Sequence, residues 1–309
     1  WWTLTTGRMQ IQSMWMMRPT IYITEDYDHN LFNIQMLAQH IRQFKTTDPV
    51  EHLPELYVHH AKVVFGAVKD GHYQPLNAIG LEGEIRASDA DTATYDFKFP
   101  RQNPDPAVKS AVSGQFNLRD KTFSVEIEKF HFDRLERNFL SRQLRAWWDL
   151  LEPQGQVPHI HIAYTAEHQL IARIQLANGQ INVPYKNSRS QMTGVTGQFV
   201  VTSDQVRVHE LSGSIEGIRY LINGSIDGLN IDAPFQFNIQ TDEFVVVNDP
   251  KWVATLPTAV QEHFQRFRPS GRFAGHAMIA RQARDGLQVH GTLEVIDAEA
   301  AYQLFDYRL

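Results

Sequence analysis

Residues 116–127, Phe-Asn-Leu-Arg-Asp-Lys-Thr-Phe-Ser-Val-Glu-Ile, decide the fold class of this chain. Apolar and polar residues alternate on both sides of a polar turn at Arg119–Lys121. The apolar positions are Phe116, Leu118, Phe123, Val125 and Ile127. Because successive side chains of a β-strand point to opposite faces, this pattern is typical of two antiparallel strands that share one apolar face.

The same alternation recurs along most of the chain. Clear examples are Ile160, Ile162 and Tyr164, the run from Ile171 to Leu176, Val206–Val208, and Phe235, Phe237 and Ile239. Strands with one apolar face, joined by short polar turns, indicate an antiparallel sheet. The sequence therefore predicts a mainly β protein, a β-rich member of the α+β class.

Two stretches, residues 136–151 and 253–267, carry helical spacing instead. In each of them, four apolar residues follow one another at steps of four, four and three. They are Leu140, Leu144, Trp148 and Leu151 in the first stretch, and Leu256, Val260, Phe264 and Phe267 in the second. Such stripes predict short amphipathic helices. A weaker stripe predicts a third helix over residues 33–45.

The two helical stretches also form a sequence repeat. A shift of 116 residues places each apolar position of the first on its counterpart, and it carries Pro153 to Pro269 and Gly155 to Gly271. This predicts repeated modules of about 116 residues that stack on one continuous core. The resulting division is an N-terminal segment (1–52), a first module (53–165), a second module (166–281) and the start of a third (282–309).

Composition excludes several functional classes. The chain has 309 residues, of which 42% are hydrophobic, and its net charge is −6. A mildly acidic chain is poorly suited to bind phosphate backbones, so we expect no nucleic-acid partner. The absence of cysteine rules out thiol nucleophiles, zinc–thiolate sites and disulfides. No apolar run reaches the length of a membrane-spanning helix.

The sequence carries no catalytic signature, such as Gly-x-Ser-x-Gly, Gly-x-Gly-x-x-Gly or His-Glu-x-x-His. His159 and His161 would share one face of a strand, but no third ligand stands at a fixed local spacing, and we interpret them as surface histidines. Asp26, Asp28 and Asn30 begin like a calcium loop that lacks its Gly and Glu. We therefore expect no catalytic residue, metal or cofactor, and an enzyme is the third-ranked hypothesis.

Several segments resemble a known family when they are taken in order. An extended stretch at Arg18–Thr24 precedes an acidic turn at Glu25–Asp28 and an Asn-Leu segment at Asn30–Asn33. A Leu-Pro-Glu-Leu segment and two Leu-x-Gly stretches follow, at Leu53–Leu56, Leu81–Gly83 and Leu211–Gly213. Over nearly the whole chain, this order resembles AsmA-like proteins of bacterial envelopes (AsmA/TamB type), starting just after their membrane anchor.

The resemblance implies a long, twisted, curled antiparallel sheet that forms a groove, tethered to the inner membrane and extending into the periplasm. It also implies a non-enzymatic lipid conduit in outer-membrane and envelope assembly, with phospholipid or another acyl lipid as ligand and envelope proteins as further partners. The chain lacks the family's anchor helix and C-terminal end, so we expect a truncated fragment whose missing segment makes the membrane association. The residues expected to line the groove are Phe116, Leu118, Ile160, Ile162, Phe235, Phe237 and Ile239.

Alternation alone does not separate a lipid-lined groove from the filled core between two packed sheets, because the same residues occupy one face in both. The main alternative is therefore a structural or adhesive β-repeat scaffold that binds protein partners. A continuous apolar trough, open along one side, would favour the conduit. A closely packed interior would favour the scaffold, and a local pocket with convergent titratable groups would favour an enzyme.

Overall fold

The protein is a single open sheet of seventeen strands with two short helices in the described residues. The computed structural model describes residues 12–28, 31–33, 54–89, 93–100, 111–132, 140, 142–165, 167, 169–185, 188–246, 253, 258–282 and 286–299. The mainly β class predicted from alternation is thereby confirmed. The predicted helix over 33–45 lies outside the described residues except for Asn33.

The strands range from two to sixteen residues. The first nine are β1 (Ser13–Met17), β2 (Thr20–Asp26), β3 (Leu31–Phe32), β4 (Glu55–Lys69), β5 (His72–Ala87), β6 (Thr94–Pro100), β7 (Ala111–Asn117), β8 (Thr122–His131) and β9 (Gln154–Tyr164). The others are β10 (Leu170–Tyr185), β11 (Ser188–Val201), β12 (Val206–Ile215), β13 (Ile218–Ile226), β14 (Phe235–Thr241), β15 (Phe244–Val246), β16 (Ser270–Arg281) and β17 (Leu287–Glu299). The helices are α3 (Arg142–Leu151) and α5 (Thr258–Phe267).

From β4 to the C-terminal end the sheet is an antiparallel meander. Each strand pairs with its neighbour in the chain, except that β14 and β15 both pair with β16. The N-terminal end departs from the antiparallel prediction, because β1 and β2 lie one after the other along β4 and run parallel to it. Parallel neighbours cannot be joined by a two-residue hairpin turn. The sheet is therefore mixed.

Two tight turns show how local sequence sets the meander. Asp70 and Gly71 join β4 to β5 with φ angles of 52° and 73°, and Glu216 and Gly217 join β12 to β13 with φ angles of 50° and 84°. Positive φ at both central residues is the geometry of a type I′ turn, whose twist matches that of the flanking strands. Glycine at the second position accepts this conformation without steric cost.

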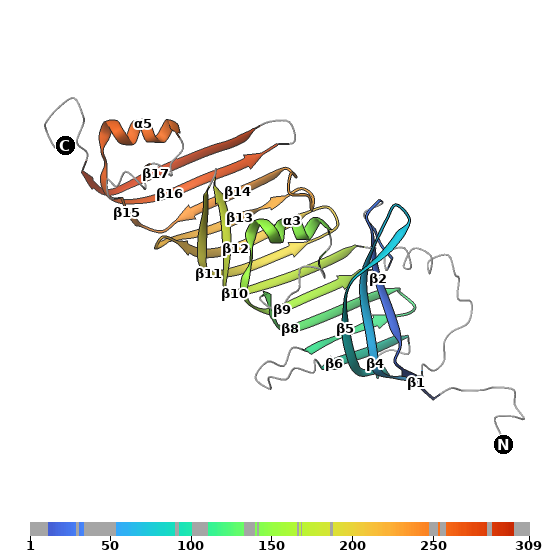
Figure 1. Cartoon of the computed structure of the whole chain (residues 1–309). Helices are drawn as coiled ribbons and strands as arrows, with labels where there is room; N and C mark the ends of the chain where they lie inside the picture. Colours follow the sequence, from blue (N-terminus) through green and yellow to red (C-terminus); the bar gives the residue numbers. More distant parts are fainter. Residues whose placement is uncertain are drawn as a thin grey trace, which may run out of the picture.

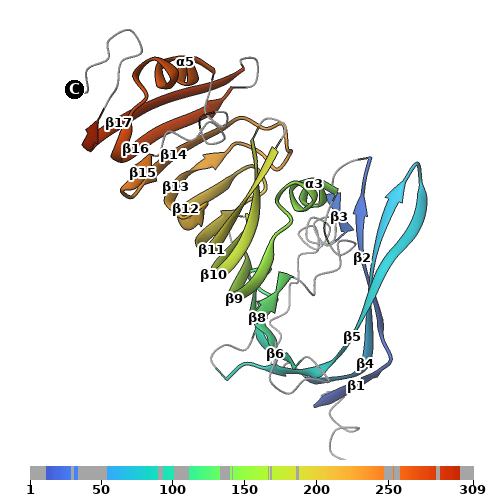
Figure 2. The same ribbon diagram turned by 60° about the vertical axis from the view of Figure 1, so that its left-hand side comes forward.

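The sheet is long and twisted, and its N-terminal part curls back over one face (Figures 1 and 2). In Figure 2 the blue and cyan strands β2–β5 form one side of a U, strands β8–β11 form the other, and β1 and β6 lie near the base. Helix α3 lies between the two sides, close to β3. The strands from β12 to β17 continue the second side, and α5 lies on their far end.

Glycines on the inner face let aromatic rings of the neighbouring strand lie close to the sheet. A methyl group added at Gly114 would lie 2.6 Å from Cζ of Phe97, and one at Gly224 would lie 2.5 Å from Cδ1 of Phe237. In both cases the ring belongs to the residue directly opposite on the next strand. In designed sheets, glycines introduce curvature, and aromatic rings that cover glycines help to fix the strand register.

The 116-residue repeat is visible in the backbone. The equivalent pairs are Trp148 and Phe264, Glu152 and Arg268, Gly155 and Gly271, and Val157 and Phe273. At the end of the first helix, the amide of Glu152 donates a 2.8 Å hydrogen bond to the carbonyl of Trp148, and at the end of the second, Arg268 donates one of the same length to Phe264. The φ angles of Glu152 and Arg268 are 42° and 40°. Val157 and Phe273 are each almost fully buried. The end of each helix and the strand that follows it thus repeat, while the division into modules stays a prediction.

The main core lies where α3 meets the sheet. Val157, Met192 and Val195 are completely buried there. Phe132 packs against this core and also meets Trp148 of α3 edge-on, with ring centroids 5.5 Å apart. A smaller cluster, with Val246, Val253, Phe264 and Phe273, forms the equivalent core beneath α5. The helices therefore cover only parts of the apolar face.

Candidate functional site

One row of apolar side chains crosses most of the sheet. In what we call the central row, each residue lies directly opposite the next one on the neighbouring strand, across eleven strands. The row consists of Phe99, Val112, Ile127, Ile160, Ile174, Phe199, Val208, Gly224, Phe237, Ile279 and Val289. Ten steps of about 4.8 Å between strands give the row a length of about 48 Å.

A second row, the flanking row, runs beside it two residues along each strand. It consists of Phe97, Gly114, Val125, Ile162, Ala172, Val201, Val206, Ile226, Phe235, Arg281 and Leu287. Ten of these eleven residues are apolar, and Arg281 is the exception. Because side chains two apart share a face, the two rows form one continuous apolar band.

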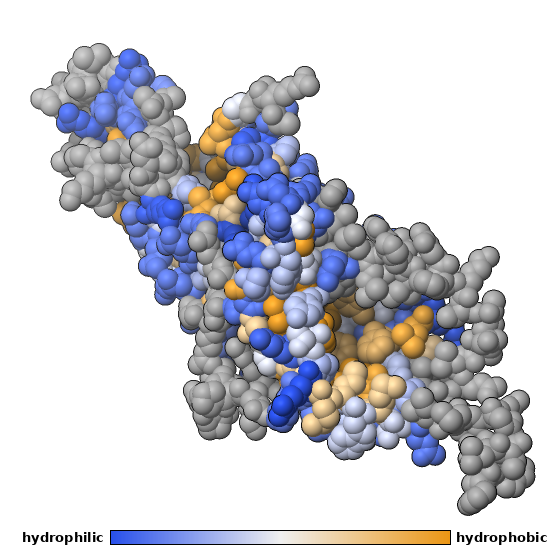
Figure 3. All heavy atoms as spheres, turned by 45° about the vertical axis from the view of Figure 1, so that its right-hand side comes forward, coloured by the Kyte–Doolittle hydropathy of each residue, from blue (hydrophilic) through white to orange (hydrophobic). Residues whose placement is uncertain are grey.

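The band lies on the inner face of the curled sheet. Ile160, Ile174 and Phe199 of the central row pack against the core that α3 covers, and α3 lies inside the curve (Figure 2). Most of the band is only half-buried: Val208 is 4% exposed, whereas Val289 on the last described strand is 49% exposed. Figure 3 shows apolar residues in the hollows between the N-terminal strands and the rest of the sheet. We call this apolar inner face of the curled sheet the trough.

Six of the seven residues predicted to line a groove lie on this face. Ile160 and Phe237 belong to the central row and Ile162 and Phe235 to the flanking row, while Phe116 and Ile239 are two residues further along β7 and β14. The structure therefore brings these six together on one surface. Whether they contact a ligand stays a prediction.

Leu118 does not share their setting. Strand β7 ends at Asn117, whose side-chain oxygen accepts a 2.8 Å hydrogen bond from the amide of Asp120 and so begins the turn. Leu118 lies in that turn, 47% exposed, and its amide donates to the carbonyl of Ala93 at 2.9 Å. The alternation runs one step beyond the strand, because asparagine stops the strand before the apolar pattern ends.

The central row also contains residues that the sequence reading did not select. Phe99, Ile174 and Phe199 belong to strands with the same alternation, and Ile279 and Val289 continue the row to the last described strand. The signal for Phe99 was present in the run Tyr-Asp-Phe-Lys-Phe at residues 95–99. In strands with a register shift, such as β10 with β11, the alternation is harder to follow in the sequence, because a bulge moves the later residues to the other face.

A polar contact joins the two sides of the trough. Both carboxylate oxygens of Glu25 on β2 accept from the amide of Arg142, at 3.1 Å each, at the start of α3. The guanidinium of Arg145 approaches the same carboxylate at 4.0 Å and donates to the hydroxyl of Tyr27. We call these four residues the clasp. Glu25 and Arg142 lie 117 residues apart in sequence, so the clasp ties the N-terminal edge to the first module.

Among the residues that the structure describes, Glu25 is the charged residue that is buried, with 6% of its surface exposed. Burial raises the pKa of its carboxyl above the ordinary value of 4.5, while the amide of Arg142 and the charges of Arg145 and Arg142 oppose that rise. A carboxylate at a helix N-terminus also interacts favourably with the exposed amide dipoles there. The clasp thus balances a desolvation cost against charge-assisted hydrogen bonds.

Helix α3 is held at further points along its length. The indole nitrogen of Trp147 donates to the carbonyl of Leu229 at 2.9 Å, in the loop between β13 and β14. Just after the helix, the carboxylate of Glu152 accepts from Asn182 at 2.7 Å and from Arg189 at 2.5 Å, on β10 and β11. Together with the clasp, these contacts hold α3 across the trough as a strap between its two sides.

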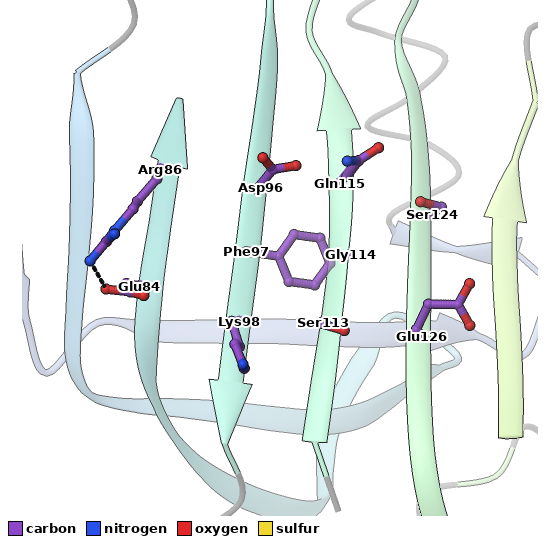
Figure 4. A pocket seen from close by; sticks show the side chains of 10 residues that line it. All are labelled: Glu84, Arg86, Asp96, Phe97, Lys98, Ser113, Gly114, Gln115, Ser124 and Glu126. Atoms are coloured by element: carbon purple, nitrogen blue, oxygen red, sulfur yellow. Dashed lines mark hydrogen bonds and ion pairs between the residues drawn. The ribbon is translucent and has the colours of Figure 1, made fainter. Parts of the chain in front are cut away.

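The outer face is polar where the inner face is apolar. A shallow depression of about 540 Å³ crosses β5–β8 there, and in Figure 4 the faint blue N-terminal strands pass behind it. It is lined by Glu84, Arg86, Asp96, Phe97, Lys98, Ser113, Gly114, Gln115, Ser124 and Glu126. Glu84 and Arg86 form an ion pair of 2.6 Å (Figure 4). Acidic and basic groups of this open surface interact with each other and with water.

The two histidines singled out in the sequence lie on this outer face. His159 forms an ion pair with Glu126 of β8, and Nε2 of His161 lies 3.7 Å from the same carboxylate. Within the residues described here, no group of three or more histidine and acidic side chains is arranged to hold a metal ion. No helix in the same part of the chain is long and apolar enough to cross a membrane.

Comparison with known proteins adds no family. No family model, curated protein or solved structure matches the chain.

Proposed function

We propose that this protein is a non-enzymatic lipid conduit that holds acyl chains along the central and flanking rows. Its mechanism is passive: acyl chains lie on the apolar inner face and slide along it, while polar headgroups stay near the open rim. In keeping with the sequence resemblance, we place it among AsmA-like proteins that act in the periplasm, at the bacterial inner membrane, in envelope assembly.

The length and continuity of the central row support this proposal most strongly. A single leaflet of a bilayer has a hydrocarbon thickness of about 15 Å, half of the usual ~30 Å core. An apolar row of about 48 Å is several times longer than one acyl chain requires, so a chain has room to move from strand to strand. The half-buried state of most row residues means that apolar surface is left for a ligand to cover.

The filled β-repeat scaffold remains the competing account. The fully buried Val157, Met192 and Val195 show that the region beneath α3 is packed like an ordinary core. The two accounts differ in what the rest of the inner face does, because a scaffold would leave its half-exposed band empty or covered by protein. Binding of lipid to that band is therefore the deciding observation.

The test uses the 309-residue chain and phosphatidylethanolamine vesicles, with bound lipid counted by native mass spectrometry. On β14 inner and outer residues alternate strictly, which provides a matched pair of variants. Ile239→Asp puts a charge on the inner face, two residues from Phe237 of the central row, and is expected to lower bound lipid several-fold. Asn238→Asp adds the same charge on the outer face and should leave binding unchanged.

Circular dichroism must first show that both variants are folded. If Ile239→Asp is not, Val289→Asp on the exposed end of the central row replaces it, because that side chain is already 49% exposed. A folded wild-type chain that takes up no lipid would overturn the proposal and favour the scaffold. Equal binding by Ile239→Asp and Asn238→Asp would also overturn it.

A further inference from the structure

Arg281 is a charged residue in an otherwise apolar surface. It is the last residue of β16, and in the flanking row it lies between Phe235 of β14 and Leu287 of β17. The next pair along these strands is Phe237 with Ile279 in the central row. A step of two residues along a strand is about 6.7 Å. The guanidinium therefore lies at a strand end, beside the long apolar row.

Two carbonyl groups and one aromatic ring hold this side chain. Nη2 donates to the carbonyls of Ile231 and Ala233, at 2.6 Å and 2.9 Å, in the loop between β13 and β14. The guanidinium carbon lies 5.0 Å from the ring centre of Phe235. These contacts fix the position of the group, and the ring adds a cation–π attraction.

Within the described residues, Nε of Arg281 has no hydrogen-bond acceptor. This Nε is buried, whereas the two hydrogen bonds to the loop carbonyls both come from Nη2. No carboxylate of the described residues lies within ion-pair distance of this guanidinium, whereas Arg272 on the same strand pairs with both Glu243 and Asp297. If Arg281 served only to tie the loop, Nη2 alone would suffice.

A positive charge on an apolar surface, with donors left over, favours an anionic acceptor. Guanidinium groups bind phosphate oxygens strongly because the charge assists each hydrogen bond. The charge, the free donors and the adjoining apolar row together match the two ends of an amphiphile.

We propose that Arg281 is the headgroup site of the trough and binds the phosphate of a phospholipid whose acyl chains lie on Phe237 and Ile279. This inference rests on the proposed function, and it adds a preference among acyl lipids. A lipid with a phosphate is held at Arg281, between Phe235 of β14 and Leu287 of β17. A neutral lipid with the same chains contacts only the apolar rows.

The test compares phosphatidic acid with diacylglycerol carrying the same acyl chains, each titrated into the full chain in detergent-free nanodiscs. Wild-type protein is expected to bind phosphatidic acid at least tenfold more tightly, as charge-assisted hydrogen bonds of this type allow. Arg281→Gln should remove most of that difference and change diacylglycerol binding less than twofold. Arg281→Lys, which keeps the charge, should restore part of it.

Arg272→Gln serves as the matched control, because it removes an arginine from the outer face of the same strand and should keep the tenfold preference. Equal affinity of the wild type for both lipids would overturn the headgroup site and leave the conduit intact. Failure of both lipids to bind would overturn the conduit itself. Inorganic phosphate that competes as well as the lipid would show a free-phosphate site, which also overturns the headgroup proposal.

Discussion

The dependence of affinity on acyl-chain length gives the sharpest test of the trough. The perturbation is made in the ligand: lysophospholipids with lauroyl, myristoyl and palmitoyl chains differ only in their methylene count. Full burial of a methylene contributes about 0.8 kcal/mol. A trough that is open along one side covers about half of the chain surface, which reduces the contribution to roughly 0.4 kcal/mol per methylene.

The expected effect is therefore about a twofold gain in affinity for each added methylene. From lauroyl to palmitoyl, four methylenes contribute about 1.6 kcal/mol, which corresponds to roughly 15-fold tighter binding. Complete enclosure would instead give about 3.2 kcal/mol for the same step. The slope thus reports how much of the chain the protein covers.

The central row also predicts that this gain does not level off. Its length of about 48 Å exceeds the roughly 15 Å of a leaflet's acyl chain, so each added methylene still meets apolar surface. Isothermal titration calorimetry below the critical micelle concentration measures the three dissociation constants. Ile239→Asp should flatten the slope, while Asn238→Asp should preserve it. A change of less than twofold from lauroyl to palmitoyl, or a plateau at myristoyl, would refute the reasoning.

Two further predictions concern the strap and the core. Since the pKa of Glu25 is raised in the folded protein, the folded state binds more protons above pH 4.5 than the unfolded chain does, and the free energy of unfolding falls as the pH rises through that window. Urea midpoints from pH 4 to pH 7 should therefore show a decline in the wild type that Glu25→Gln lessens; parallel curves would contradict it. Met192→Ala, at a completely buried side chain of the main core, should cost about 2–5 kcal/mol in the same assay. Met14→Ala, on the exposed β1, is its control, and a similar loss in both would contradict the core assignment.

Local patterns in the sequence were sufficient for the fold class and for the repeat. The run from Phe116 to Ile127 predicts a hairpin, and β7 and β8 form it with Phe116 opposite Phe123. The 116-residue repeat likewise predicts two helices followed by strands, and α3 and α5 occupy equivalent places. The hairpin and the two helices could be predicted because alternation and helical stripes depend only on neighbours within one element.

Other features depend on contacts that no local pattern encodes. The parallel pairing of β1 and β2 with β4 joins residues that are far apart in the chain, such as Ser13 with Glu55 and Thr20 with Lys62. The sequence reading also passed over Arg281, because its significance lies in its neighbours on β14 and β17.

The sequence by itself determined that the strands are two-faced, with apolar residues on one side and polar ones on the other. Only the tertiary structure decided that these faces join into one band, because a slip of one residue between any two strands would turn the apolar set to the opposite face. Likewise, only the fold brought Glu25 to the start of α3, 117 residues away, and so closed one side of the trough against the other. The physical reason is the same in both cases. Side-chain direction is a local property of the backbone, whereas register and curvature are set by contacts between distant segments.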